Sequence, residues 1–301
     1  MKQVRRLIAK RSVRRAEGML VAEGAELVSV ALDAGAPVAA VYLAPGARQD
    51  PAVDAVVVRA FAAGARVFDL ARGVLERVAD TVSPQPVLAV VAYATTPLAA
   101  FESASYVVVC AGVRDPGNGG TVIRTADATG ADGVVCCDGT VDVTNPKTVR
   151  ASAGSLFHVP VADGGDPHEA VDALRTAGMA VVGTTLRGGV DYLSVDWTRR
   201  VAIVFGNEAG GLPVSLAAAC DTLVTIPMVG RAESLNVGVA AAVLGFEVLR
   251  QRRAVGPGRA GTPARVGGSV PGSVGTGDRS TMPQMSAGDR GTGNHDEVEP
   301  G

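Results

Sequence analysis

The sequence predicts an α/β protein with a small N-terminal α/β domain and a larger C-terminal domain built on a parallel sheet. Its 301 residues are enough for about two domains of roughly 150 residues each. Apolar residues make up 47% of the chain and aromatic residues 4%, so a core can form and must consist mainly of Val, Ala and Leu. In the second half, short apolar segments alternate with helical patterns, which is typical of a parallel sheet covered on both faces.

The N-terminal domain is predicted over residues 1–95. Its expected elements are, in order, a helix followed by a strand within 17–44, a strand at 54–61, a helix near 70–80 and a strand at 87–93. Residues 96–104, within "ATTPLAAFESA", are predicted to be a linker.

The C-terminal domain is predicted over residues 105–254. Expected strands are 106–113, 133–138, 180–186, 200–206 and 221–228, and expected helices lie near 119–130 and 166–178. A last helix begins near Leu235 and opens with the small or β-branched residues 237–243. Such residues let another backbone or a ligand approach closely, and Ser234 or Asn236 could cap the helix start.

The end of the chain has a different composition. Residues 256–301 contain 12 Gly and 5 Pro and no Leu, Ile, Phe, Trp or Tyr, so they cannot bury enough apolar surface to offset the entropy of ordering. A disordered tail is therefore predicted over 255–301.

Charge is unevenly distributed although the net charge is only −2. Residues 1–15, "MKQVRRLIAKRSVRR", contain seven basic residues and no acid. This arm either contacts phosphates or forms a solvated helix face. If it contacts RNA, the candidate residues are Arg5, Arg6, Lys10, Arg11, Arg14 and Arg15.

The four cysteines have no zinc-ligand spacing and do not suggest a secreted disulfide framework. No segment reaches the ~18 apolar residues of a membrane span. The basic N-terminus lacks the apolar region and cleavage site of a signal peptide. We expect buried free thiols, a cytoplasmic protein and no metal.

Three loops follow strand ends and are unusually rich in Gly, Asn and acidic residues. They are "RDPGNGGTVIRTA" (114–126), "FGNEAGGLP" (205–213) and the start of the stretch "IPMVGRAESLNVGVAAAVLGFE" (226–247). Each could be ordinary turn chemistry. Because ligands of open parallel sheets bind beyond the carboxyl ends of the strands, the three together predict a binding site.

Other classes of site fit less well. The spacing of Gly117, Gly119 and Gly120 does not match the dinucleotide-binding fingerprint G-x-G-x-x-G. The chain has no G-x-S-x-G elbow of a hydrolase, and its three histidines lie in no set with metal-ligand spacing.

The motifs "DPGNGGTVIRTA", "IVFGNEAGGLP" and "IPMVGRAESLNVGVAAAV" resemble, in this order, the three signature motifs of the SpoU–TrmH family. This family consists of RNA ribose 2′-O-methyltransferases of the SPOUT superfamily that use S-adenosylmethionine. "RASAGSLFHVPV" (150–161) is similar to a further family segment, and "GMLVAEGAELVSVAL" resembles the ribosomal-protein-like N-terminal domain of some members. The chain departs from the family at "MLVAEG", where "FLVEG" is usual, and at Gly238, where Ser is common; the glycine should soften the helix start.

The resemblance implies a trefoil knot in the C-terminal domain and a homodimer with the cofactor pocket near the subunit interface. It also implies roles for individual residues. The residues expected to bind S-adenosylmethionine are Leu186, Gly206, Ile226, Met228, Leu235 and Asn236. The residues expected in catalysis are Asn118, Arg124, Glu208, Ser234 and Asn236.

Two of these residues have alternative interpretations. The pKa of arginine is above about 12, so Arg124 is a poor general base, and we expect it to stabilise the developing alkoxide, with a phosphate as proton acceptor. A structural Arg124 would instead pair with Asp127, three residues further along the helix. Glu208 could simply cap its own loop.

The resemblance favours 23S rRNA as substrate, because members with this N-terminal domain mostly resemble rRNA enzymes. The alternatives are a tRNA 2′-O-methyltransferase and a non-catalytic RNA-binding module.

Overall fold

Two β-sheets organise the chain in the computed structural model, which describes residues 1–78 and 84–256. The first sheet has the order β1-β4-β2-β3. Strand β4 (Val87–Ala92) pairs antiparallel with β1 (Met19–Glu23) and β2 (Val38–Leu43), and β3 (Arg66–Asp69) pairs parallel with β2. The predicted tail lies outside the described residues apart from its first two positions.

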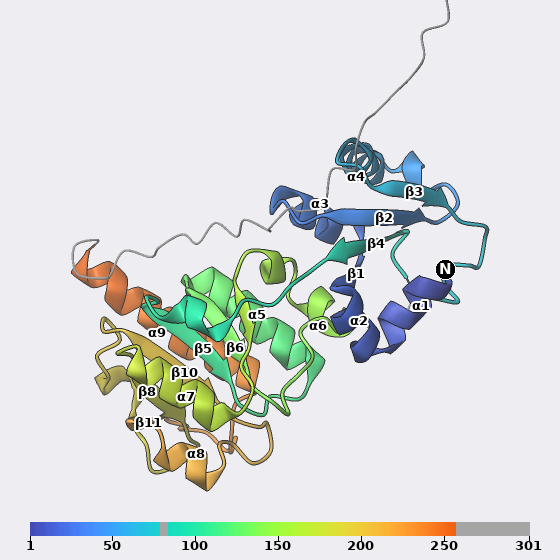
Figure 1. The fold of residues 1–301 in the computed structure, drawn as a ribbon. Helices are drawn as coiled ribbons and strands as arrows, with labels where there is room; N and C mark the ends of the chain where they lie inside the picture. The colour runs from blue at the N-terminus through green and yellow to red at the C-terminus, as the bar shows by residue number, and fades with distance from the viewer. Residues whose placement is uncertain (79–83, 257–301) are drawn as a thin grey trace, which may run out of the picture. The chain divides into compact units, whose positions relative to one another are not determined.

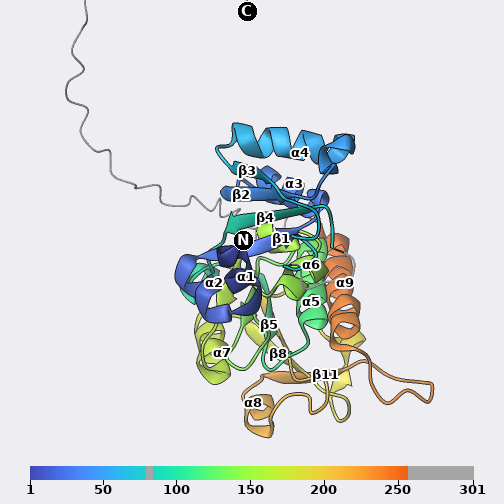
Figure 2. The ribbon, with the colours of Figure 1, turned by 90° about the vertical axis from the view of Figure 1, so that its right-hand side faces the viewer.

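Helices cover both faces of the first sheet (Figure 2). Alternate residues of β2 point to opposite faces. Tyr42 packs with helices α1 (Lys2–Ala9) and α2 (Arg11–Glu17), whereas Val41 packs with α3 (Ala25–Asp33) and α4 (Pro51–Ala62). The basic N-terminal arm is therefore a pair of helices whose apolar sides contribute to a core.

The strand predicted at 54–61 is wrong, because these residues belong to helix α4. Val53, Val56, Val57 and Ala60 are buried at the i, i+3, i+4, i+7 spacing of a helix. Asp50 caps the helix by accepting a hydrogen bond from the backbone N–H of Ala52, and proline occupies the first turn. The three consecutive valines 56–58 favoured a strand. The Asp50 cap and the helical spacing of the apolar residues instead favour a helix.

Other parts of the first domain were predicted incompletely. The helix and strand within 17–44 are confirmed as α3 and β2, but β1 precedes them, between Gly18 and Gly24, whose φ angles are both positive. A helix was predicted near residues 70–80, but residues 72–78 form turns, and residues 79–80 lie outside the described part of the chain. The edge strand β3 was not predicted.

The second sheet is parallel and has the order β7-β6-β5-β10-β8-β11-β9. Five of its strands were predicted, and the short strands β7 and β9 were missed. The bounds are β5 Tyr106–Cys110, β6 Gly133–Cys136, β7 Val161–Asp163, β8 Ala180–Thr184, β9 Val190–Asp191, β10 Val201–Phe205 and β11 Thr222–Thr225.

Five α-helices accompany this sheet in the described part of the chain: α5 (Pro116–Thr129), α6 (Pro146–Ala151), α7 (Pro167–Thr176), α8 (Val214–Ala218) and α9 (Val237–Val255). Short 3-10 turns occur at Ala47–Gln49, Leu98–Phe101, Ser155–Phe157 and Tyr192–Ser194. Helices α7 and α9 lie on opposite faces of the sheet (Figure 1). Val108 packs on the side of α5 and α9, and Val107 on the side of α7 and α8, as expected for a buried parallel strand.

The small residues of α9 allow it to lie against α5. A Cβ atom on Gly238 would be 2.8 Å from Cγ2 of Thr121, and one on Gly245 would be 3.0 Å from the hydroxyl of Thr129. Asn236 caps α9 by accepting hydrogen bonds from the backbone N–H groups of Gly238 (2.9 Å) and Val239 (3.3 Å). Capping therefore explains Asn236 at the start of α9, and close packing against α5 explains the small residues that follow it.

The predicted linker is packed against the second sheet. Thr96 forms a bridge with Ala162 beside β7, and the buried ring of Phe101 occupies the place where a side chain on Gly133 would lie. The two sheets also share one apolar core, which includes Leu20 and Val28 from the first domain and Val149 and Leu156 from the second. Val30 of α3 lies against Gly154, so close that a Cβ there would be 2.6 Å from Cγ1 of the valine.

Candidate active site

A cavity of about 280 Å³ lies at the carboxyl ends of β8, β10 and β11. This is the edge where an open parallel sheet binds its ligands. Mostly apolar atoms line the cavity, with Phe205, Val224 and Leu244 at its buried side. All six residues predicted to bind the cofactor line it: Leu186, Gly206, Ile226, Met228, Leu235 and Asn236.

The loop after β10 is closed by its own backbone. Asn207 and Gly211 exchange two backbone hydrogen bonds of 2.9 and 2.8 Å. A Cβ on Gly206 would lie 2.2 Å from the carbonyl carbon of Gly211, so only glycine fits at this position. The peptide of Gly206 can therefore form part of the cavity wall without a side chain in front of it.

A network of hydrogen bonds joins the three loops beside the cavity. The side-chain N–H of Asn118 donates to the carboxylate of Glu208 at 3.0 Å, and that of Asn236 donates to the carbonyl oxygen of Asn118 at 2.7 Å. Glu208 also accepts bonds of 3.1 to 3.2 Å from the backbone N–H groups of Arg114 and Asp115. The structure thus brings together three of the five residues predicted in catalysis.

These bonds determine the charge of Glu208. Partial burial acts to raise the pKa of this carboxyl, but the hydrogen bonds from Asn118 and from the backbone of Asp115 and Arg114 outweigh it and hold the pKa below its usual value. Glu208 is therefore ionised at neutral pH and its oxygens are occupied. It is suited to orient Asn118 and poorly suited to accept a proton.

Asn207 also belongs to this network and was not predicted. Its side-chain N–H groups donate to the backbone carbonyl of Gly112 at 3.0 Å and to Glu208 at 3.3 Å. It thereby ties the loop after β10 to the loop after β5. Its place in "FGNEAGG", between Gly206 and Glu208, was the available signal.

Ser234 and Arg124 lie differently from the other predicted catalytic residues. Ser234 lines the cavity at its exposed side. Arg124 is exposed on α5 and does not line the cavity. Within residues 1–78 and 84–256 its side chain has no hydrogen bond or ion pair, and Asp127, its alternative partner, instead contacts His158 at 3.2 Å.

The basic residues of the N-terminal arm that were predicted to contact RNA divide into two groups. Arg5, Arg6, Lys10, Arg11 and Arg15 are exposed. Arg14 is only 3% exposed and is ion-paired with Asp142. It also donates to the backbone carbonyl of Ile8 at 3.0 Å and to the hydroxyl of Thr144 at 3.1 Å. Arg14 is therefore not an RNA contact, and its guanidinium fastens the arm to the second domain.

Two features are missing from the residues that the structure describes. They contain no group of three or more His, Cys, Asp or Glu side chains that could hold a metal ion. No helix among them is both long and apolar enough to cross a membrane. All four cysteines lie within the described residues and are free thiols.

The structure is that of a two-domain α/β protein with a cavity at the edge of a parallel sheet, and comparison with known proteins identifies its family. Residues 105–246 match the model of the SpoU rRNA Methylase family, and residues 1–89 match the MRM3-like substrate binding domain. The chain belongs to the SpoU rRNA methylase family.

Two curated relatives illustrate the similarity. The 23S rRNA (guanosine(2553)-2'-O)-methyltransferase RlmP of Bacillus subtilis is 40% identical over 185 residues, which are 62% of this chain and 73% of the relative. The 23S rRNA (uridine(2479)-2'-O)-methyltransferase of Streptomyces viridochromogenes is 42% identical over 142 residues, which are 46% of this chain and half of the relative.

Solved structures match over both domains. The AdoMet-bound rRNA methyltransferase from Sinorhizobium meliloti has a TM-score of 0.73 and 36% identity, covering 83% of this chain and 93% of that one. The SpoU methyltransferase AviRb from Streptomyces viridochromogenes, in complex with AdoMet, has a TM-score of 0.75 and 31% identity, covering 84% and 97%.

Proposed function

We propose that this protein transfers a methyl group from S-adenosylmethionine to a ribose 2′-hydroxyl of structured RNA, with 23S rRNA as the favoured substrate. One observation carries the proposal: the network of Asn118, Glu208 and Asn236 borders a cavity lined by all six predicted cofactor residues. Relatives named as 23S rRNA 2′-O-methyltransferases support the choice of RNA. Because rRNA is its substrate, the protein works in the cytoplasm.

The cavity suits S-adenosylmethionine in its chemistry. Ile226, Met228 and Leu235 offer apolar contact to the adenosyl group, and the peptide of Gly206 offers backbone polar groups without a side chain in the way. When bound, the cofactor supplies a methyl group made electrophilic by its sulfonium. Leu186, which is 58% exposed, lines the cavity on its solvent side.

Residues of this chain hold the reacting ribose in line with that methyl group, and such positioning can supply several kcal/mol. The amide of Asn118 is fixed at both ends, because it donates to Glu208 and accepts from Asn236. A fixed amide presents its remaining N–H and lone pair to substrate in one orientation. Ser234, at the exposed side of the cavity, contributes a hydroxyl toward the same substrate.

Arg124 stabilises the negative charge that develops on the ribose oxygen as its proton leaves. Its guanidinium is exposed and has no ion pair with the described residues, so it is available to an RNA ligand. An uncompensated cation is what charge stabilisation of an alkoxide requires. Since Glu208 is ionised and already hydrogen-bonded, a phosphate of the RNA accepts the proton.

The two domains divide the work, with residues 1–95 docking RNA and residues 105–254 carrying the reaction. The similarity of residues 1–89 to a substrate-binding domain supports this division. Exposed basic side chains of α1 and α2, namely Arg5, Arg6, Lys10, Arg11 and Arg15, provide phosphate contacts.

The protein acts as a homodimer through α9. Val239 and Phe246 are 47% and 53% exposed on this helix and are seven residues apart, which places them on one face. Exposed apolar side chains on one helix face favour burial against a partner. Replacing Phe246 with Glu is expected to halve the mass measured by light scattering; an unchanged mass would exclude this face as the interface.

A trefoil knot in the C-terminal domain is part of the same proposal. Strand β11 lies two places beyond β10 in the sheet, yet the chain returns from it through residues 226–236 to α9, which packs on α5 beside β5. This return across the carboxyl edge is the path that a knotted connection takes. Knots are rare among proteins, so topology is a distinctive part of the proposal.

Methyl incorporation tests the function directly. The purified protein is incubated with labelled S-adenosylmethionine and either total rRNA or total tRNA, and the labelled ribose is mapped. We expect label in 23S rRNA. Label confined to tRNA would favour the tRNA enzyme, and RNA binding without transfer or cofactor binding would favour the non-catalytic module.

A further inference from the structure

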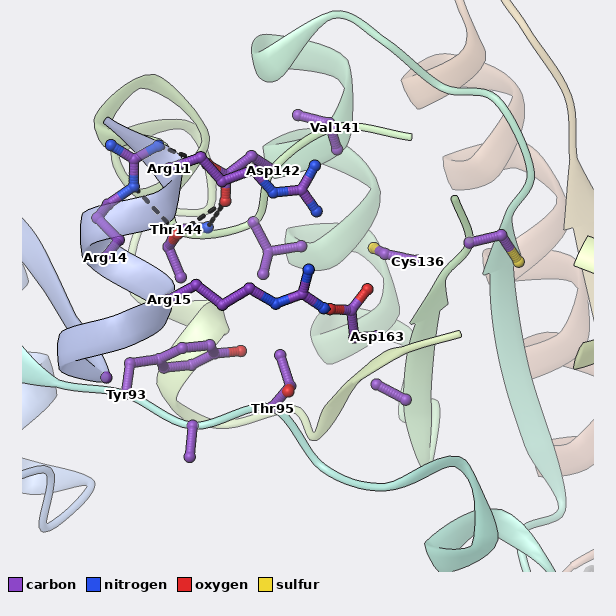
Figure 3. Close-up of a pocket in the computed structure, with 15 residues that line it drawn as sticks. Arg11, Arg14, Arg15, Tyr93, Thr95, Cys136, Val141, Asp142, Thr144 and Asp163 are labelled. Atoms are coloured by element: carbon purple, nitrogen blue, oxygen red, sulfur yellow. Dashed lines mark hydrogen bonds and ion pairs between the residues drawn. The ribbon is translucent and has the colours of Figure 1, made fainter. Parts of the chain in front are cut away.

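A second cavity, of about 260 Å³, lies at the carboxyl ends of β6 and β7 (Figure 3). It shares no lining residue with the candidate cofactor cavity. Helix α2 forms one side, and the segment Tyr93–Thr95, which follows β4, forms another. Residues from both domains therefore build this cavity, at the edge of the sheet where ligands bind.

One wall of the cavity is rigid. The buried Arg14 joins the arm to Asp142, and Asp142 in turn accepts bonds from the backbone N–H of Thr144 at 3.0 Å and from its hydroxyl at 2.7 Å. Figure 3 shows these bonds converging on the Asp142 carboxylate. A ligand consequently meets a preformed surface here, which lowers the cost of binding.

Two further arginines of α2 line the cavity and can bind an anion. Arg11 is exposed, and its side chain has no hydrogen bond or ion pair with the residues that the structure describes. Arg15 is 69% exposed and pairs with Asp163. An exposed pair of this kind contributes only about 0–1 kcal/mol, so a phosphate can displace the carboxylate from Arg15.

Tyr93 supplies a polar group without a partner. Its hydroxyl points inward, toward the side of the cavity where Arg15 and Thr95 lie (Figure 3). Within the described ranges this hydroxyl forms no hydrogen bond. Burial, with a smaller effect from Cys136, raises the pKa of Tyr93, so the hydroxyl stays protonated and can donate.

We propose that this cavity binds one unpaired nucleotide of the substrate RNA, outside the site of methyl transfer. Arg11 and Arg15 bind its phosphate, and Tyr93 donates to the base or ribose. The cavity thereby reads a nucleotide separate from the one that is methylated. This inference rests on the proposed function, because it takes RNA as the substrate.

The carboxylates explain why the ligand is a nucleotide rather than a bare anion. Asp142 and Asp163 are 15% and 27% exposed, and both line the cavity. They would repel a simple phosphate placed deep inside. A base edge carries N–H donors that a carboxylate accepts, as in carboxylate contacts to the amino group of cytosine. Unpaired bases are also the form in which proteins read RNA sequence.

Two single substitutions test the two halves of the proposed contact in the full-length protein. Tyr93→Phe removes only the hydroxyl and should weaken rRNA binding roughly five- to tenfold, the scale of one hydrogen bond, without changing its salt dependence. Arg11→Ala should weaken binding and lower the slope of log affinity against log salt by about one. S-adenosylmethionine affinity should stay unchanged in both variants.

Arg48→Ala is the matched control. Arg48 lies in the same domain, is 49% exposed and does not line the cavity. Among the residues that the structure describes, its side chain pairs only with Asp54, at 3.7 Å. Its loss should leave rRNA affinity within about twofold of the wild type, the scale of a surface pair. Unchanged melting temperatures would show that all three variants are folded.

Cross-linking locates the nucleotide without relying on catalysis. Wild-type protein is irradiated with rRNA that contains 4-thiouridine, and the cross-linked peptides are sequenced. We expect a cross-link within 93–95 or 11–18. If this cross-link forms but no methyl group is transferred to any RNA, the binding site is supported and the proposed function is refuted. If rRNA is methylated, cross-links map elsewhere and Tyr93→Phe and Arg11→Ala bind normally, the binding site is refuted and the function stands.

Discussion

Arg14 and Arg124 have the same side chain and opposite environments. Arg14 is 3% exposed and bound to Asp142, to a threonine hydroxyl and to backbone carbonyls. Arg124 is exposed, and among the described residues nothing pairs with it. Burying an arginine is costly unless its donors are satisfied, so Arg14 is structural, whereas the charge of Arg124 is available for a ligand.

Replacing Arg124 with Ala is expected to lower methyl transfer by roughly a hundredfold or more, because it removes one stabiliser of transition-state charge. Folding should be preserved, since this exposed side chain pairs with none of the described residues. S-adenosylmethionine affinity should be preserved because Arg124 does not line the cofactor cavity, and the mass of the proposed dimer should not change. Single-turnover methylation of rRNA measures the loss. A variant that folds, binds cofactor and turns over normally would falsify the role.

Asn118→Ala is expected to lower transfer as well, because it interrupts the bonds between Glu208 and Asn236. The double variant Arg124→Ala/Asn118→Ala should lose less than the sum of the two single effects if both residues act on the same oxygen. Strictly additive losses would show that they act independently.

Because the pKa of Glu208 is lowered in the folded protein, the stability of the fold should decrease in acid. Because the folded-state pKa lies below the unfolded value of about 4.5, ionised Glu208 stabilises the fold fully above that pH, and the stabilisation is lost as pH falls through the folded value. The difference in unfolding free energy between wild type and Glu208→Gln should therefore be present at pH 7 and shrink below pH 4.5. Urea unfolding of both proteins at pH 7 and below pH 4.5 measures this difference in free energy. The same difference at both pH values would contradict a stabilising, hydrogen-bonded Glu208 carboxylate.

Helices α5 and α9 show how one glycine can be suited to its neighbour. The glycine at position 238 was expected to soften the start of this helix. The structure adds that a Cβ here would lie 2.8 Å from Cγ2 and 3.0 Å from Cβ of Thr121. Gly238 thus accommodates a threonine on the facing helix, while Asn236 still caps α9.

Gly238→Ser is expected to destabilise this protein by about 1–3 kcal/mol, the usual cost of overpacking a close contact. Thr121→Ala in the same chain should recover most of that loss, because it removes the methyl group in conflict. Thermal unfolding of the two single variants and the double variant measures the coupling. Equal destabilisation with and without the second substitution would show that the clash lies elsewhere.

Elements with a strong apolar pattern could be predicted from sequence, and short or edge elements could not. The central strands β5 and β10 are continuous apolar runs, so the sequence indicated them clearly. Strand β9 has two residues, both exposed, and β3 is mostly exposed at a sheet edge, so neither carries a hydrophobic signal. The β propensity of Val56 and Val57 led to the wrong prediction of a strand where the structure has α4. Asp50 and Pro51 were signals of a helix start.

At the scale of the whole molecule, the contacts between distant segments were not predictable. The motifs identified the loops that carry Asn118, Glu208 and Asn236. Which of these side chains donates to which other one is seen only in the structure. Likewise, the pairing of Arg14 with Asp142 joins residues 128 positions apart. The distribution of basic residues in 1–15 does not indicate that Arg14 is buried while its basic neighbours are exposed.

Replacing Arg14 with Ala is expected to cost about 3 kcal/mol or more of stability, because it leaves the Asp142 carboxylate buried without its cation. Arg15→Ala is the control, since its pair with Asp163 is largely exposed and should cost no more than about 1 kcal/mol. Chemical unfolding measures both. Equal small losses would mean that Arg14 does not hold the junction.

The apolar core that runs from Leu20 and Val28 to Val149 and Leu156 has a consequence for RNA selection. An arm fastened to the catalytic domain through this core and through Arg14 cannot shift freely during docking. If the arm binds a phosphate as proposed, the protein sets the distance along the RNA between that phosphate and the reacting ribose. A target nucleotide would be chosen by its distance from the anchoring point as much as by its own base.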